Sequence, residues 1–135
     1  MATEDTGDSF GFTEKRELPR LLCPPAFSNS LLEIGGAQYE ADSINFNRNG
    51  LGIFVNGRLP NVDGGMVSFQ FEREDRQLIE ITGLPFELVY SNETEVGSQY
   101  GLKFETGGVS DDVKEALREI EIELGRQATM NRYGL

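Results

Sequence analysis

Histidine and tryptophan are absent from this sequence of 135 residues, and cysteine occurs once. Without histidine, the chain lacks the usual general base near neutral pH and the commonest metal ligand. The single cysteine, Cys23, excludes an internal disulfide and a cysteine-rich zinc site. Cationic side chains are also scarce, because 12 lysines and arginines stand against 23 acidic residues, for a net charge of −11. Non-specific binding to nucleic acid or to an anionic membrane is therefore not expected, since both need cationic patches.

Long hydrophobic runs are also missing, and none approaches the ~20 residues of a membrane-spanning helix. The first ten residues are acidic and polar, without the cationic start and apolar middle of a secretory signal. We therefore expect a cytoplasmic protein in a reducing compartment, with Cys23 as a structural or loop thiol. No metal site, cofactor or catalytic residue is predicted, because a helix start explains the acidic pair at 111–112 and the spacing of a calcium loop is absent.

Most of the sequence alternates between apolar and polar residues with the period of two that is typical of strands. Gly35-Gly36 and Asn56-Gly57 are turn signals, and the asparagine-rich stretch 45–49 also favours a turn or bulge. The pattern predicts strands at 27–34, 37–44, 51–55, 66–71, 77–81, 84–90 and 99–105, with the fifth and sixth separated by a break at Gly83 and Pro85. About six strands with glycine-rich turns and no helix between them predict an antiparallel barrel or sandwich.

The period changes near the C-terminus, where Ser110 is a good N-cap and two aspartates follow it. Apolar residues then recur at helical spacing, at Val113, Ala116, Leu117, Ile120 and Leu124. Gly125 is expected to weaken or stop the helix. The expected organisation is a flexible acidic arm at 1–14, a β-barrel at 15–108, a helix at 109–126 packed on or beside the barrel, and a tail at 127–135.

Two short motifs carry the chemistry of a possible binding site. Arg16 and Arg20 lie four residues apart on a segment that Pro19 keeps extended. Guanidinium groups bind phosphate oxygens and stack on flat rings, and the amides of Asn45 and Asn47 can read a polar edge. A glycine at position 50 lets a ligand approach the backbone closely. The alternatives are a solvated basic patch for the arginines and a plain turn for the asparagines.

The order and spacing of these motifs resemble the PilZ domain family, small β-barrel receptors for the bacterial second messenger cyclic di-GMP. The family pattern has two arginines separated by three residues, then about two dozen residues, then Asp or Asn, any residue, Ser, two residues and Gly. The sequence Leu51-Gly-Ile, the segment Tyr100-Gly-Leu-Lys-Phe104 and the closing helix also match, so the resemblance covers about residues 15–125. Asn47 stands where the family usually has serine.

This resemblance implies a six-stranded antiparallel β-barrel of the split-barrel type with one C-terminal helix. It implies that cyclic di-GMP is bound by Arg16, Arg20, Asn45, Asn47 and Gly50, with Lys15 and Arg48 as additional candidates. The function it implies is a non-enzymatic receptor or adaptor, of the kind that acts in motility and biofilm signalling, which changes conformation on binding and signals through a protein partner. The alternative is a ligand-independent adaptor in pilus, motility or secretion machinery.

Overall fold

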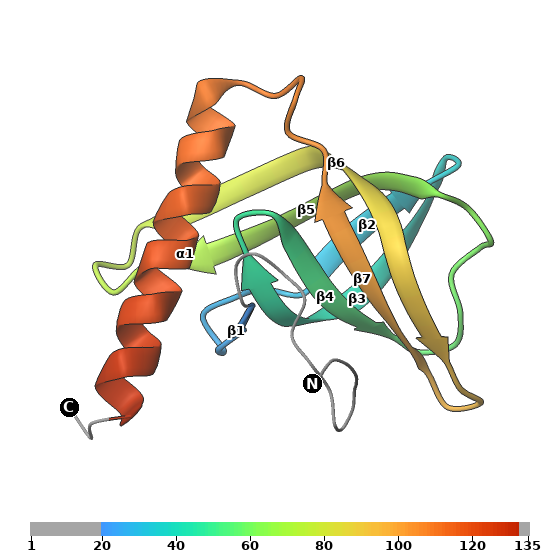
Figure 1. Ribbon diagram of the computed structural model, residues 1–135, viewed down its shortest axis with the longest axis horizontal. Coiled ribbons are helices and arrows are strands. Elements are labelled where there is room, and N and C mark those ends of the chain that lie inside the picture. The colour runs from blue at the N-terminus through green and yellow to red at the C-terminus, as the bar shows by residue number, and fades with distance from the viewer. Residues whose placement is uncertain (1–19, 133–135) are drawn as a thin grey trace, which may run out of the picture.

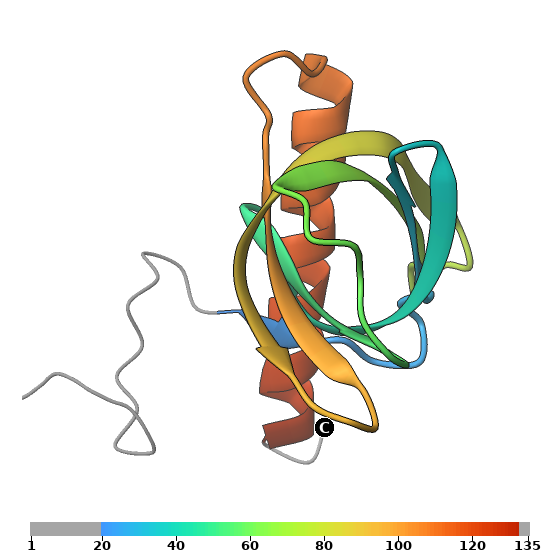
Figure 2. The same cartoon turned by 90° about the vertical axis from the view of Figure 1, so that its right-hand side faces the viewer.

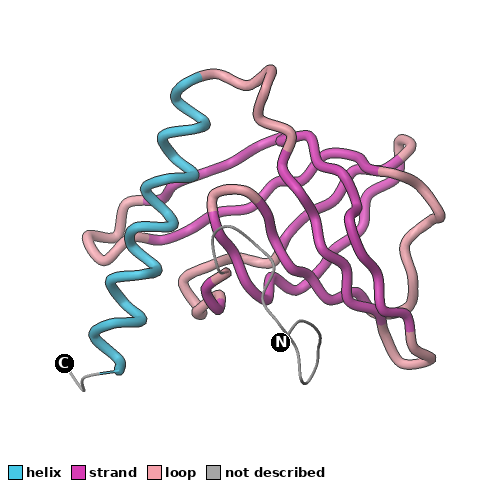
Figure 3. The backbone as a smooth tube through the Cα atoms, viewed as in Figure 1, coloured by secondary structure: helices cyan, strands magenta, loops and turns pink. Residues whose placement is uncertain are grey.

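The computed structural model describes residues 20–132 of the chain. Seven strands precede one helix (Figures 1 and 3). The elements are β1 (Leu21–Leu22), β2 (Ser30–Ile34), β3 (Ala37–Asn47), β4 (Gly50–Val55), β5 (Gly64–Glu72), β6 (Leu78–Glu93), β7 (Ser98–Phe104) and α1 (Asp111–Arg132).

Six of the strands close into a barrel. They are hydrogen-bonded in the order β3-β2-β5-β6-β7-β4, every pairing is antiparallel, and β4 pairs back with β3. Closure leaves no long strand edge free, and Figure 2 shows the strands curving round a common interior. The short β1 lies outside this ring, antiparallel to the end of β3. The predicted six-stranded barrel with a C-terminal helix is confirmed.

The barrel interior is filled by side chains that alternate with outward-facing ones along each strand. Phenylalanine rings form its centre, with neighbouring ring centroids 5.2 to 6.1 Å apart, and they belong to Phe27, Phe46, Phe69, Phe71 and Phe104. Leu51 and Leu102 are fully buried beside them. The period-two pattern of the sequence therefore identifies the core because burial follows the same alternation.

Helix α1 lies across one end of the barrel (Figure 1). Its buried residues are Leu117, Ile120 and Leu124, which complete the core. The Ser110 hydroxyl accepts the backbone N–H of Val113 at 3.3 Å, which confirms the predicted N-cap. Ion pairs join the helix to the hairpin between β5 and β6, with Arg73 Nη1 3.0 Å from Glu119 Oε2 and Arg126 Nη2 2.6 Å from Glu74 Oε1.

The helix is longer than predicted. It passes through Gly125 and continues to Arg132, so residues 127–132 are helical instead of belonging to a tail. Packing explains the difference, since Leu124 is buried and Arg126 is held by two glutamates. These contacts outweigh the roughly 1 kcal/mol helix penalty of a glycine. No helix within residues 20–132 is long and apolar enough to span a membrane.

Several strand boundaries also differ from the prediction, and the largest differences are in β2, β3 and β6. The segments 77–81 and 84–90 form one strand, β6, which passes through Gly83 at a φ of 62° and is irregular opposite Val67–Phe69. The first barrel strand begins at Ser30, while Phe27 makes an isolated bridge with Phe71. Strand β3 runs on to Asn47, so the expected turn at 45–49 is confined to Arg48 and Asn49.

The helix contact with the barrel can be tested by two isoleucines on α1. Ile120 is completely buried, whereas Ile122 is 62% exposed. We expect Ile120→Ala to lower the free energy of unfolding by about 2–5 kcal/mol, because it opens a cavity in the core. Ile122→Ala, as the matched control, should change it by less than about 0.5 kcal/mol. Urea titration followed by circular dichroism measures both, and equal losses would mean that α1 does not complete the core.

Candidate functional site

The outer face of four neighbouring strands carries two rows of residues that pair across the sheet. The first row, from β3 to β6, is Asn45, Gly52, Gly101 and Tyr90. The second row is Asn47, Gly50, Lys103 and Glu87. Core residues such as Leu51 and Leu102 alternate with both rows, so these eight positions lie on the outside of the barrel.

Two bulges determine which side chains belong to the first row. The pairing of β3 with β4 passes from Ser43 to Asn45 and omits Ile44. The pairing of β6 with β7 passes from Leu88 to Tyr90 and omits Val89. An extra residue re-aims the side chain that follows it. Each bulge thus brings a polar or aromatic side chain opposite a glycine of the next strand.

Three glycines, which we call the glycine patch (Gly50, Gly52 and Gly101), let other side chains lie flat on the barrel. A Cβ at Gly52 would overlap Asn45 Oδ1, and a Cβ at Gly101 would overlap the ring of Tyr90. At Gly50 it would overlap the Arg20 guanidinium. The patch is continuous, because Gly52 and Gly101 are direct partners across β4 and β7. A guanidinium, an amide and a phenol ring are thereby gathered on one surface.

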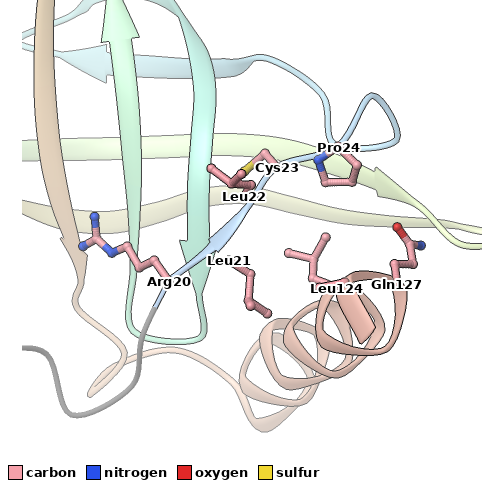
Figure 4. Close-up of a pocket in the computed structure, with 8 residues that line it drawn as sticks. Arg20, Leu21, Leu22, Cys23, Pro24, Leu124 and Gln127 are labelled. Carbon is pink, nitrogen blue, oxygen red and sulfur yellow. The ribbon is translucent and has the colours of Figure 1, made fainter. Parts of the chain in front are cut away.

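Arg20 reaches this surface from the segment just before β1. Leu22 pairs with Asn45 and Leu21 with Phe46, so the preceding residue comes alongside the end of β3. Its Nη2 donates a hydrogen bond of 3.0 Å to the carbonyl of Leu102 on β7. Figure 4 shows the guanidinium directed away from α1 and over the barrel strands. The structure thus brings Arg20 to Gly50, as the sequence prediction requires.

Asn45 and Asn47 have different environments although they are two residues apart. The Oδ1 of Asn45 is buried over Gly52, and no donor within residues 20–132 forms a hydrogen bond to it. Asn47 is only 2% exposed, and its Oδ1 accepts the N–H groups of Asn49 at 2.7 Å and Gly50 at 3.0 Å. Asn47 therefore shapes the β3–β4 turn, and Asn45 holds an acceptor over Gly52 that has no donor within residues 20–132.

Arg48 lies in the same turn and contacts helix α1. Its Nε is 3.0 Å from Glu121 Oε1, and its backbone N–H donates to Glu121 Oε2 at 3.0 Å. One carboxylate therefore fixes both the side chain and the backbone of this residue. Lys15 and Arg16, the remaining predicted site residues, lie outside the described residues.

The sequence prediction did not include Tyr90, Gly101, Lys103 or Glu87 among the site residues. The alternation of 99–105 already placed positions 101 and 103 on the face opposite the core side chains of β7. Their pairing with β4 and β6 could not be predicted, because it depends on which strands are neighbours and, for Tyr90 and Gly101, on the bulge between Leu88 and Tyr90. Tyr90 is 42% exposed, and its ring is the aromatic surface of the site.

A hollow of about 540 Å³ borders the site on the side of the helix. It lies between β1 and the second half of α1, and Figure 4 shows its lining, which includes Arg20, Leu21, Cys23, Leu124 and Gln127. The pKa of the Cys23 thiol is raised from 9.0 to about 12, because burial disfavours the thiolate. This cysteine is therefore a neutral, apolar part of the wall at physiological pH.

The raised pKa of Cys23 makes a prediction for its reactivity. Because only the thiolate reacts, a pKa near 12 instead of 9.0 lowers the reactive fraction at pH 8 on the order of a thousand-fold. Iodoacetamide should modify the folded protein far more slowly than the chain unfolded in urea, with a rate that still rises above pH 10. Mass spectrometry follows the reaction, and equal rates in the two states would contradict the burial of this thiol.

The glycine patch predicts an unusual response to alanine. In most strand interiors alanine is more stable than glycine by roughly 0.5–1 kcal/mol. Gly52→Ala should instead destabilise the protein by about 1–3 kcal/mol, because its methyl group displaces the side chain of Asn45. Gly107→Ala is the control, since a Cβ there has no atom within 4 Å. If urea titration finds Gly52→Ala more stable than the unmodified protein, Asn45 is not held over Gly52.

Comparison with known proteins agrees with this geometry at the level of the fold. The sequence matches no family model and no curated protein. The crystal structure of YcgR in complex with c-di-GMP from Escherichia coli has a TM-score of 0.66 at 14% identity, covering 91% of this chain and 51% of that one. The PilZ domain of YcgR with c-di-GMP has a TM-score of 0.63 at 14% identity, covering 90% of this chain and all of that domain. This chain therefore spans about half of YcgR, and its fold is that of a PilZ domain.

Proposed function

We propose that this protein is a receptor for cyclic di-GMP and that the ligand lies on the glycine patch. The observation that carries the proposal is the placement of the Arg20 guanidinium over Gly50, next to the acceptor of Asn45 over Gly52. The solved structures with this fold contain the same ligand. The patch supplies what a cyclic dinucleotide requires, namely a cation for phosphate and flat polar groups for guanine.

The proposed roles follow from the environment of each residue. Arg20, together with Arg16, binds phosphate oxygens and guanine faces, because its planar group can do both. The buried Oδ1 of Asn45 accepts an N–H from the guanine edge, which satisfies an acceptor that lacks a donor within residues 20–132. Gly50 allows close approach, and Asn47 acts by holding the turn that presents Gly50. Lys15 and Arg48 are secondary candidates, and Arg48 would first have to leave Glu121.

The output that we propose is a change in the surface offered to a cytoplasmic protein partner, with no catalytic step. Arg20 directly precedes β1, and Leu21 of β1 packs towards α1. A ligand that draws Arg20 out from its bond to Leu102 would therefore alter the surface between β1 and the helix. A ligand-independent adaptor is the alternative, and a partner captured equally with and without cyclic di-GMP would favour it.

The receptor proposal predicts a large effect of Arg20 on affinity. A hydrogen bond to a charged group contributes about 1.5–3 kcal/mol, so Arg20→Ala should weaken binding of cyclic di-GMP by about 10- to 100-fold. Arg118→Ala is the matched control, because Arg118 lies on the exposed side of α1, where its ion pair within residues 20–132 is with Glu115. It should bind like the unmodified protein. Isothermal titration calorimetry on the full chain measures the affinity of the unmodified protein and of both variants.

Two results would count against the receptor proposal. Unmodified protein that releases no heat with cyclic di-GMP at tens of micromolar would favour the adaptor. Equal affinities of the unmodified protein and the Arg20→Ala variant would show that binding occurs elsewhere. Cyclic di-AMP serves as the ligand control, because it has the same phosphates and lacks the guanine edge that Asn45 is proposed to bind.

A further inference from the structure

Lys103 lies on the outer face of β7, directly beside the glycine patch. It is the pairing partner of Gly50 on β4 and of Glu87 on β6. The Arg20 guanidinium, which covers Gly50, is bonded to the carbonyl of Leu102, the residue before Lys103. Two cationic side chains therefore adjoin Gly50 from different directions, although the chain as a whole carries a charge of −11.

Lys103 differs from most cationic residues in the described part of the chain because it is not held in an ion pair. Ion pairs with carboxylates hold six arginines there, namely Arg48, Arg58, Arg73, Arg76, Arg118 and Arg126. Lys103 is exposed and forms no such pair within residues 20–132, although Glu87 is its neighbour across the sheet. Its ammonium group can reach a ligand without first breaking an ion pair, which Arg48 cannot do.

We propose that Lys103 is a phosphate-binding residue of this site and that Glu87 opposes the same phosphate. The inference rests on the proposed function and adds two residues to its ligand contacts. An ammonium is a compact charge suited to a phosphodiester oxygen, and the planar guanidinium of Arg20 beside it is suited to a guanine face. A carboxylate at Glu87, one strand away, repels the phosphate and attracts the lysine, so it lowers affinity for an anionic ligand.

Calorimetry of the full chain with cyclic di-GMP at two NaCl concentrations tests Lys103. Lys103→Gln should weaken binding about 5- to 20-fold and reduce the loss of affinity with salt, because one screened attraction is removed. Lys103→Arg should restore most of the affinity. Lys114→Gln is the control for a lost lysine charge, because Lys114 is an exposed residue of α1. This variant should match the unmodified protein in both affinity and salt dependence.

Glu87→Gln gives an independent test with the opposite sign. Removing this carboxylate should tighten binding about 2- to 5-fold and raise the salt dependence. Both positions are exposed, so urea midpoints within error of the unmodified protein are expected for all variants. Unchanged affinity and salt dependence in Lys103→Gln would overturn the role of the lysine, and weaker binding by Glu87→Gln would overturn that of the glutamate.

The two proposals fail in different ways. If the unmodified protein binds cyclic di-GMP and Arg20→Ala weakens it while Lys103→Gln does not, the receptor function holds and the role of Lys103 is wrong. If the unmodified protein does not bind, the receptor function is wrong, and the role of Lys103 falls with it.

Discussion

The pairing of Gly52 with Gly101 is the constraint on which the proposed site depends. Two opposed glycines in the middle of a sheet cost conformational entropy, about 0.5–1 kcal/mol each relative to alanine. On the inner face of the same strands, Leu51 and Leu102 are completely buried, and this packing offsets the cost. The outer face gains a shallow surface on which side chains from β3 and β6 lie flat. Any Cβ at these positions would remove that surface.

Most of the fold could be predicted from the sequence because burial in a closed barrel repeats the alternation of apolar and polar residues. The turn at Gly35-Gly36 and the cap at Ser110 were also visible, since each depends only on neighbouring residues. The positions of the bulges were not visible, although a turn or bulge was expected at 45–49, next to the shift between Ser43 and Asn45. A shift of one residue reverses the face of every later side chain, so the register that places Tyr90 opposite Gly101 needs the partner strand to be known. The prediction of the helix end was wrong for a related reason, because the residues flanking Gly125 make contacts distant in sequence, Leu124 in the core and Arg126 with Glu74.

The candidate site was predictable in its location and less so in its roles. The spacing of Arg20, Asn45 and Gly50 placed them together, and the structure does bring them to one surface. The string Asn-Phe-Asn did not show which asparagine lies over the sheet and which bonds the turn, because that depends on where the strand ends and the turn begins. As β3 continues to Asn47, this side chain bonds the turn and Asn45 lies over the sheet. Asparagine at position 47 is compatible with this turn, because its Oδ1 accepts the N–H groups of Asn49 and Gly50. A serine there would offer an acceptor on a shorter side chain.

The two-residue strand β1 connects this surface to the helix. On one side of it, Arg20 bonds the carbonyl of Leu102, and on the other, the side chain of Leu21 lies 3.8 Å from the position that a Cβ of Gly125 would occupy. Because β1 pairs with β3 through only two residues, few backbone bonds resist its displacement. The packing of Leu21 towards α1 therefore contributes to holding Arg20 over Gly50. Under the proposed function, a ligand that displaces Arg20 would therefore act on the contact between Leu21 and α1 through adjacent residues of β1.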